Sequence, residues 1–177
     1  SPPVALEDTR KQISVLVVEI VTPVQAYDAA DPEVFMQTVE PLLDLGTSVV
    51  KQQAGIVVHR GQADLTVIFG ALAPVEDHAL LGVQAALAVS RAVHDADQAT
   101  QVKAAIDTGE AIVRVRMLPQ GWRVEVNGPP VRVAQRLAHA LKHGVISVTS
   151  RTRKAVGDSL MVEALDPSTY PSLMHDQ

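Results

Sequence analysis

The order of apolar and polar positions along the chain predicts strands and helices that alternate within one domain. Residues 12–22 form a nearly continuous apolar run rich in β-branched side chains, which is typical of a central strand covered on both faces. Helical spacing of apolar residues follows over 31–53 and again over 75–93. Between these two predicted helices, residues 56–69 contain two β-rich runs around a polar corner at 60–64, which predicts a β-hairpin.

The second half of the chain predicts another hairpin, then a strand, a helix and a short strand. Residues 102–116 are expected to turn at Thr108–Gly109. A strand that starts at Trp122 leads through a loop into a helix that ends at His143. The remaining predicted strands cover 145–148 and 158–165.

This order suits an α+β sandwich built on a ferredoxin-like core (βαββαβ), with helices on one face of the sheet. In that topology the end of the first strand lies beside the corner of the first hairpin. Glu19 is therefore expected to neighbour Ala63 and Asp64. The predicted division of the chain is a linker at 1–9, a domain at 10–165 and a tail at 166–177.

Composition excludes several classes of function. Lys and Arg number 15 against 20 acidic residues, which gives a net charge of -5, and without a long basic run the chain does not predict a nucleic-acid-binding surface. Cysteine is absent, which excludes disulfides, thiolate metal sites and a cysteine nucleophile. No apolar run approaches the roughly 20 residues of a membrane span. We therefore expect no membrane segment and a cytoplasmic location.

Four segments carry a family resemblance. The first hairpin reads Gly61-Gln-Ala-Asp-Leu-Thr-Val-Ile-Phe-Gly70 and is followed by Glu76-Asp77-His78; further on stand Asp107-Thr-Gly-Glu110 and Gly128-Pro-Pro-Val-Arg-Val-Ala-Gln-Arg-Leu137. They resemble the class III nucleotide cyclase homology domain. Its bacterial members often read Gly-Asp-Ala-Val-Met-Ala-Val-Phe-Gly, Glu-Asp-His-Ala, Gly-Ile-His-Thr-Gly-Glu and Gly-Asp-Ala-Val-Asn-Leu-Ala-Ala-Arg-Leu at these places. The resemblance covers residues 10–162 and implies the fold of adenylate and guanylate cyclases.

The resemblance also implies a metal site, with departures in this chain. Active members use two carboxylates to hold two divalent ions, Mg or Mn, which serve in-line phosphoryl transfer. Glu19 stands at the first of these positions; its alternative role is a strand-end carboxylate paired to a nearby base. Ala63 stands at the second position, with Asp64 one place late. A bulge at Gly61–Gln62 would be needed to turn Asp64 toward the site.

The remaining site residues implied by the resemblance are cationic or polar. Arg136 matches the helical arginine that steadies the transition state, and Arg132 replaces a ribose-orienting asparagine. His59 and Glu125 occupy the two base-selecting positions. The alternative role of Arg136 is pairing with a surface carboxylate. The alternative for His59 and Glu125 is an exposed salt bridge with each other. Pro23 removes one backbone donor to phosphate.

Two other clusters have weaker signals. His139 and His143 stand at i and i+4, which is compatible with zinc on one helix face, although solvated residues at a helix end are the alternative. The basic run 149–154 is interpreted as a solvated first turn of a helix.

These observations leave three functional hypotheses. The first is a catalytically impaired cyclase homology domain that acts as a regulatory and dimerisation module in signal transduction. The others are an active purine nucleotide cyclase that uses Glu19, Asp64 and Arg136, and a sensor that binds ATP or GTP without turnover. The expected partner is a second cyclase-like chain, identical or not, in contact with the helix that carries Val131, Val133, Ala134 and Leu137.

Overall fold

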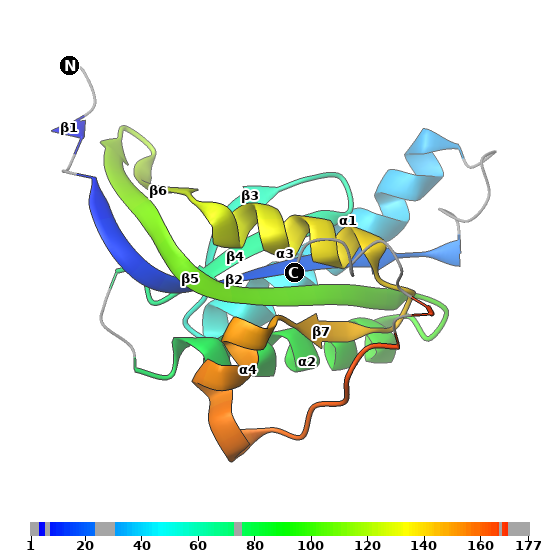
Figure 1. The fold of residues 1–177 in the computed structure, drawn as a ribbon. Helices are drawn as coiled ribbons and strands as arrows, with labels where there is room; N and C mark the ends of the chain where they lie inside the picture. Colours follow the sequence, from blue (N-terminus) through cyan, green and yellow to red (C-terminus); the bar gives the residue numbers. More distant parts are fainter. Residues whose placement is uncertain (1–3, 6–7, 24–30, 73–75, 167, 170–177) are drawn as a thin grey trace.

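The structure is a computed structural model of the chain, and it describes residues 4–5, 8–23, 31–72, 76–166 and 168–169 (Figure 1). Predictions that fall on the other residues, including the start of the second helix at Val75 and most of the tail, lie outside the described residues.

In the part of the chain so described, a mixed sheet of seven strands organises the molecule (Figure 1). Along its main path the strands follow the order β1–β5–β2–β4–β3, with antiparallel neighbours. Strand β5 also pairs with β6, antiparallel, and with β7, parallel. The strands are β1 (Val4–Ala5), β2 (Thr9–Val21), β3 (Ile56–Arg60), β4 (Asp64–Phe69), β5 (Gln101–Leu118), β6 (Gly121–Asn127) and β7 (Ile146–Val148).

Helices cover both faces of this sheet, so the prediction that they lie on one face is wrong. Helices α1 (Pro32–Gln52) and α2 (His78–Ala96) pack on one face, and α3 (Pro129–Ala140) lies on the other (Figure 1). The reason lies in β2, which is apolar at successive positions. Leu16, Val18 and Ile20 face the α1 and α2 side, whereas the alternate side chains face α3.

The start of α1 follows from its first residues. The Asp31 side chain accepts a hydrogen bond from the Glu33 backbone N–H at 2.9 Å, and Pro32 is the first helical residue. Pro129 is likewise the first residue of α3, which has no side-chain cap. Before it, Gly128 lies so close to β5 that a Cβ would stand 2.9 Å from the Ala111 Cα, which explains the glycine at this position.

The hairpin predicted over 102–116 does not form, because these residues belong to one continuous strand. Thr108 and Gly109 stand opposite Ser14 and Ile13 in an unbroken ladder between β5 and β2. The chain turns later, at Pro119–Gln120, and enters β6. A long partner strand thus outweighs the local turn tendency of a Thr-Gly pair.

The C-terminal elements also differ from their prediction. Helix α3 ends at Ala140, before His143, and the short strand β7 is confirmed. Helix α4 (Ser150–Val156) and a 3-10 turn, η2 (Gly157–Ser159), follow, and residues 160–166 form no strand.

Among the described helices, none is both long enough and apolar enough to cross a bilayer.

Candidate functional site

Glu19 and Asp64 stand directly opposite each other where β2 meets the start of β4. The Ile20 backbone N–H donates to the Ala63 carbonyl oxygen at 2.8 Å, which closes the ladder at this end. The predicted adjacency of Glu19 to the hairpin corner is therefore confirmed. Because opposed residues of an antiparallel pair share a face, both carboxylates belong to the α3 side of the sheet.

Ala63 faces the other way, since its side chain packs against the core cluster under α1 and α2. The bulge at Gly61–Gln62, which Asp64 would need in order to turn toward the site, is not the irregularity found in the register of β3 against β4. The register of β3 against β4 shifts between Val57 and His59 instead. Asp64 is the first residue of β4 and shares a face with Glu19. Its carboxylate lies over the turn, so close to Gly61 that a Cβ on this glycine would collide with it.

Lys103 is the residue of this site that the sequence analysis missed. It lies opposite Glu19 on the other flank, in β5, so that Lys103, Glu19 and Asp64 form a row across three strands. Its ammonium contacts Glu19 Oε2 at 2.9 Å and donates to the His139 carbonyl oxygen at 3.1 Å. The Lys103 side chain is only 10% exposed. A cation within the apolar run 102–106 was the available signal, because such a group needs a buried partner.

Glu19 is thus paired to a base, as its alternative role predicts. His139 Nδ1 lies 3.9 Å from the other carboxylate oxygen of Glu19, at the far end of α3. His143 lies beyond that helix, so the proposed i, i+4 pair on one helix face is not formed. Within the described residues, no three His, Cys, Asp or Glu side chains gather in a way that would hold a metal ion.

This donor set does not fit a two-ion site. Two carboxylates stand in the row, and one of them is already neutralised by an ammonium. A divalent ion beside Glu19 would be repelled by Lys103 at close range. We therefore derive no chemical step through a metal at this place.

His59 and Glu125 line one hollow of about 290 Å³ between the first hairpin, β6 and α3. Glu125 is flanked by Arg116 and Arg123, each with Nε 3.6 Å from a carboxylate oxygen, so its ion pairs are with these arginines. Thr66 also lines the hollow. Its Oγ1 is buried and has no hydrogen-bond partner among the described residues, which is costly unless a ligand or water supplies one.

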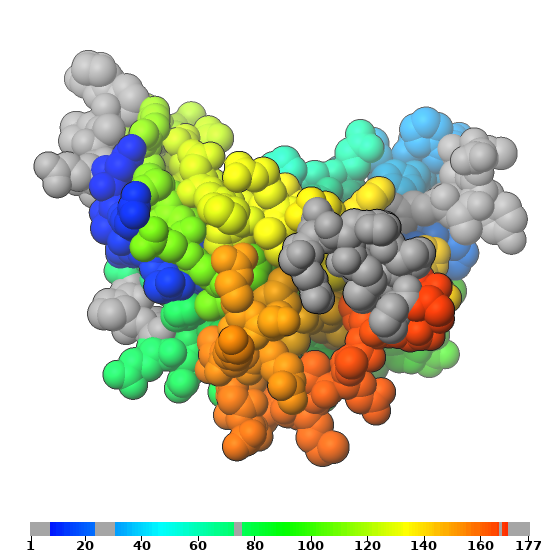
Figure 2. Space-filling view, in the orientation of Figure 1, coloured from blue at the N-terminus to red at the C-terminus, as the bar shows by residue number. Residues whose placement is uncertain are grey.

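Arg132 and Arg136 lie one turn apart on α3, and both are exposed. Neither lines the hollow of His59 and Glu125. Arg136 lines a second, larger groove of about 1,240 Å³ that extends along β7, α4 and residues 160–166. Figure 2 shows these C-terminal elements, in orange and red, covering the face below α3. Within one chain, Glu19 thus stands opposite Asp64, and His59 and Glu125 line one hollow that neither arginine lines.

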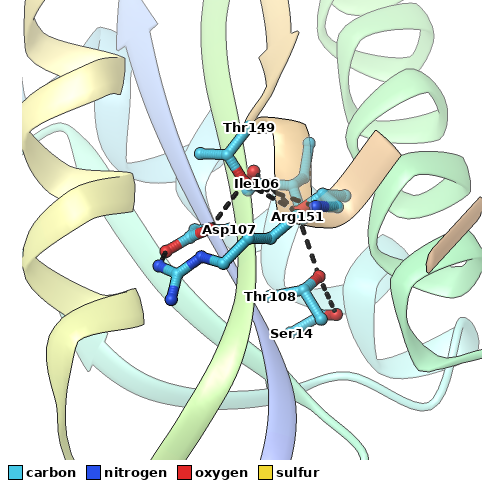
Figure 3. Close-up of polar contacts among 7 residues, drawn as sticks. Ser14, Ile106, Asp107, Thr108, Thr149 and Arg151 are labelled. Atoms are coloured by element: carbon cyan, nitrogen blue, oxygen red, sulfur yellow. Dashed lines mark hydrogen bonds and ion pairs between the residues drawn. The ribbon is translucent and has the colours of Figure 1, made fainter. Parts of the chain in front are cut away.

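Asp107 stands where the resemblance places a histidine, and it anchors α4. It is fully buried in β5, accepts a hydrogen bond from Thr149 Oγ1 at 2.6 Å and pairs with the Arg151 guanidinium (Figure 3). Thr152 of the same helix is also fully buried. The interpretation of 149–154 as a solvated first turn holds for the exposed Arg153 and Lys154 and is wrong for Thr152. Arg151 is 52% exposed and still reaches the buried carboxylate of Asp107.

Comparison with known proteins identifies the fold. No protein-family model and no curated protein sequence matches the chain. Among solved structures, the guanylyl cyclase Cya2 aligns with a TM-score of 0.73 and 23% identity, over 90% of this chain and 85% of that chain. The adenylyl cyclase CyaB from P. aeruginosa aligns with a TM-score of 0.75 and 18% identity, over 88% and 85%.

A third similar structure is a non-canonical dimeric guanylyl cyclase domain of the RhoGC fusion protein from the aquatic fungus Blastocladiella emersonii. It aligns with a TM-score of 0.72 and 16% identity, over 84% of this chain and 85% of that chain. The chain therefore has the α+β fold of class III nucleotide cyclase domains, as the resemblance implied.

Proposed function

We propose that this chain is a catalytically impaired cyclase homology domain that serves as a regulatory and dimerising module in intracellular signal transduction. The observation that carries the proposal is the Lys103–Glu19 contact at 2.9 Å, at the place where the resemblance requires a metal-binding carboxylate. Cyclisation needs two divalent ions roughly 3.5–4 Å apart to activate the hydroxyl and neutralise the triphosphate. A row of one ammonium and two carboxylates carries too little negative charge for that task.

Two further departures from the family pattern raise the same activation barrier to cyclisation. Arg132, exposed on α3, brings a guanidinium where an amide would orient the ribose, and the two groups do not hydrogen-bond alike. Ala63 faces the opposite core and has no donor atom to offer. Each further loss of about 1.4 kcal/mol in transition-state stabilisation slows the reaction about tenfold.

Incubation of the purified chain with Mn²⁺ and ATP, or with Mn²⁺ and GTP, tests this proposal. We expect no cyclic nucleotide above the level of a Glu19→Ala control. Product that forms with the wild-type chain and disappears in Glu19→Ala would instead identify an active cyclase. The position of Glu19 opposite Asp64 is the observation that favours this hypothesis.

A nucleotide sensor without turnover is a second candidate, which the hollow of His59 and Glu125 favours. The unpartnered Thr66 hydroxyl, the Glu125 carboxylate and the Gln135 amide would offer both donors and acceptors to a purine edge. Calorimetry with ATP and GTP, with and without Mn²⁺, is the measurement. Metal-independent binding that Glu125→Ala weakens would support the sensor, and heats equal to buffer dilution would exclude it.

A further inference from the structure

A chain of polar side chains runs across the α2 face of the sheet, from the start of α2 to α4. His78 Nδ1 lies 2.8 Å from Ser14 Oγ, and Ser14 Oγ lies 2.8 Å from Thr108 Oγ1. Thr108 Oγ1 lies 3.0 Å from Thr152 Oγ1, and Thr152 Oγ1 donates to the Ile106 carbonyl oxygen at 3.1 Å. Figure 3 shows the part of this chain between β2, β5 and α4.

Solvent has almost no access to the three hydroxyls. Ser14 and Thr152 are fully buried, and Thr108 is 8% exposed. Each hydroxyl has one hydrogen to donate and an oxygen that accepts. The direction of every bond in the chain is therefore coupled to the direction of its neighbours.

The direction is set at the α4 end. A carbonyl oxygen only accepts, so Thr152 uses its single hydrogen on Ile106. Thr149 Oγ1, 3.2 Å from Thr152, has no hydrogen to spare because it donates to Asp107, whose carboxylate is paired with Arg151.

Each remaining bond then follows from the one before it. Thr152 must accept from Thr108, Thr108 must accept from Ser14, and Ser14 must accept from His78 Nδ1. In the opposite direction Thr152 would donate to Thr108 and lose its bond to Ile106. That arrangement has three hydrogen bonds where the first has four.

We infer that this hydroxyl chain holds His78 in the Nδ1–H tautomer and leaves Nε2 as the nitrogen that accepts a proton or a hydrogen bond. This tautomer is the opposite of the one that free histidine favours in water. Burial lowers the pKa of His78 from its ordinary value of 6.5, which favours the neutral ring. Nε2 has no hydrogen-bond partner among the described residues. A proton taken up at Nε2 therefore leaves all four bonds of the chain intact.

The structure thus assigns a proton-accepting site to the N-terminal residue of α2. Gly70 packs against its ring, where a Cβ would lie within 3.2 Å of the imidazole carbons. The positioning residues are Ser14, Thr108 and Thr152. They touch no ligand and set only which nitrogen of the imidazole carries the proton.

Long-range ¹H–¹⁵N correlation spectra of the whole chain, labelled with ¹⁵N-histidine and recorded at pH 7.5, test the inference. The His78 signals, assigned by their loss in His78→Gln, should show a protonated Nδ1 and an unprotonated Nε2. A wild-type spectrum with the proton on Nε2 overturns the inference, whatever the variants do.

Two substitutions at Thr152 form a matched pair. Thr152→Ser keeps the hydroxyl and should keep the Nδ1–H tautomer, whereas Thr152→Val removes the acceptor for Thr108 and should shift the population toward Nε2–H. If Thr152→Val does not fold, Ser14→Ala takes its place, because it removes the contact to His78 itself. An unchanged Nδ1–H signal in folded Thr152→Val or Ser14→Ala would overturn the role of the hydroxyl chain.

Discussion

Ala63 occupies the hairpin-corner position where the resemblance places a metal-binding aspartate, and its side chain packs on the α1 and α2 side of the sheet. A carboxylate introduced there would enter an apolar environment instead of joining Glu19. We expect Ala63→Asp to destabilise the fold by about 1–3 kcal/mol and to create no cyclase activity. Urea unfolding measures the first effect, with Gln62→Asp, at an exposed neighbour, as the control. An unchanged midpoint together with new Mn²⁺-dependent activity would show that residue 63 faces the site after all.

The contact between Glu19 and Lys103 allows a second prediction at the scale of single residues. Glu19→Gln leaves the ammonium of Lys103 almost buried with a neutral partner, and we expect a loss of about 1–3 kcal/mol in the free energy of unfolding. Glu110→Gln is the matched control, because Glu110 pairs with Arg10 at 3.1 Å where both side chains are more than half exposed. That substitution should cost less than about 1 kcal/mol. Equal costs for the two variants would contradict the buried character of the Lys103 contact.

At the scale of elements, helix α4 is held by a buried carboxylate on the strand beneath it. Arg151→Ala leaves Asp107 buried without its cation, and we expect a loss of about 2–4 kcal/mol and faster amide exchange in α4 and β7. Arg153→Ala removes an exposed arginine from the same helix and should change stability by no more than about 0.5 kcal/mol. Exchange that stays slow in Arg151→Ala would show that apolar contacts alone dock α4.

The same element shows what a sequence can and cannot predict. The start of α1 follows from Asp31 and Pro32, because a cap depends on residues close together in the chain. The pairing of Asp107 with Arg151 joins residues 44 apart, and no local pattern indicates it. The Thr108–Gly109 turn was wrongly predicted for a related reason, since the partner strand that keeps β5 straight lies far away in the sequence.

At the scale of the whole molecule, helices cover both faces of the sheet, and this decides which apolar residues stay exposed to a partner chain. Of the apolar residues expected to meet a partner, Ala134 and Leu137 are buried between α3 and the sheet. Their spacing therefore reflects packing within one chain. The position of Glu19 beside the hairpin corner could be predicted, because it depends on the order of the strands. Which residues of α3 are buried could not, because that depends on the face of the sheet that α3 covers.

A pair of exposed apolar residues lies instead at the end of the β5–β6 hairpin, which projects from the body of the molecule (Figure 1). Met117 and Trp122 stand opposite each other there and are 49% and 61% exposed. Paired apolar side chains on a projecting hairpin are typical of a contact surface. We therefore expect self-association at tens of micromolar in sedimentation experiments, and Trp122→Ala should weaken it about tenfold or more, as loss of a central aromatic contact does.

Met161→Ala provides the control for this assembly. Met161 is fully exposed, but it lies in the irregular segment after α4, away from the hairpin. Its removal lowers the exposed apolar area of the molecule without touching the predicted contact, so association should be unchanged. Equal weakening by both variants would indicate nonspecific adhesion. A monomer at every concentration would leave the hairpin as a surface for a different cyclase-like chain, which co-sedimentation with such a chain would detect by the same loss in Trp122→Ala.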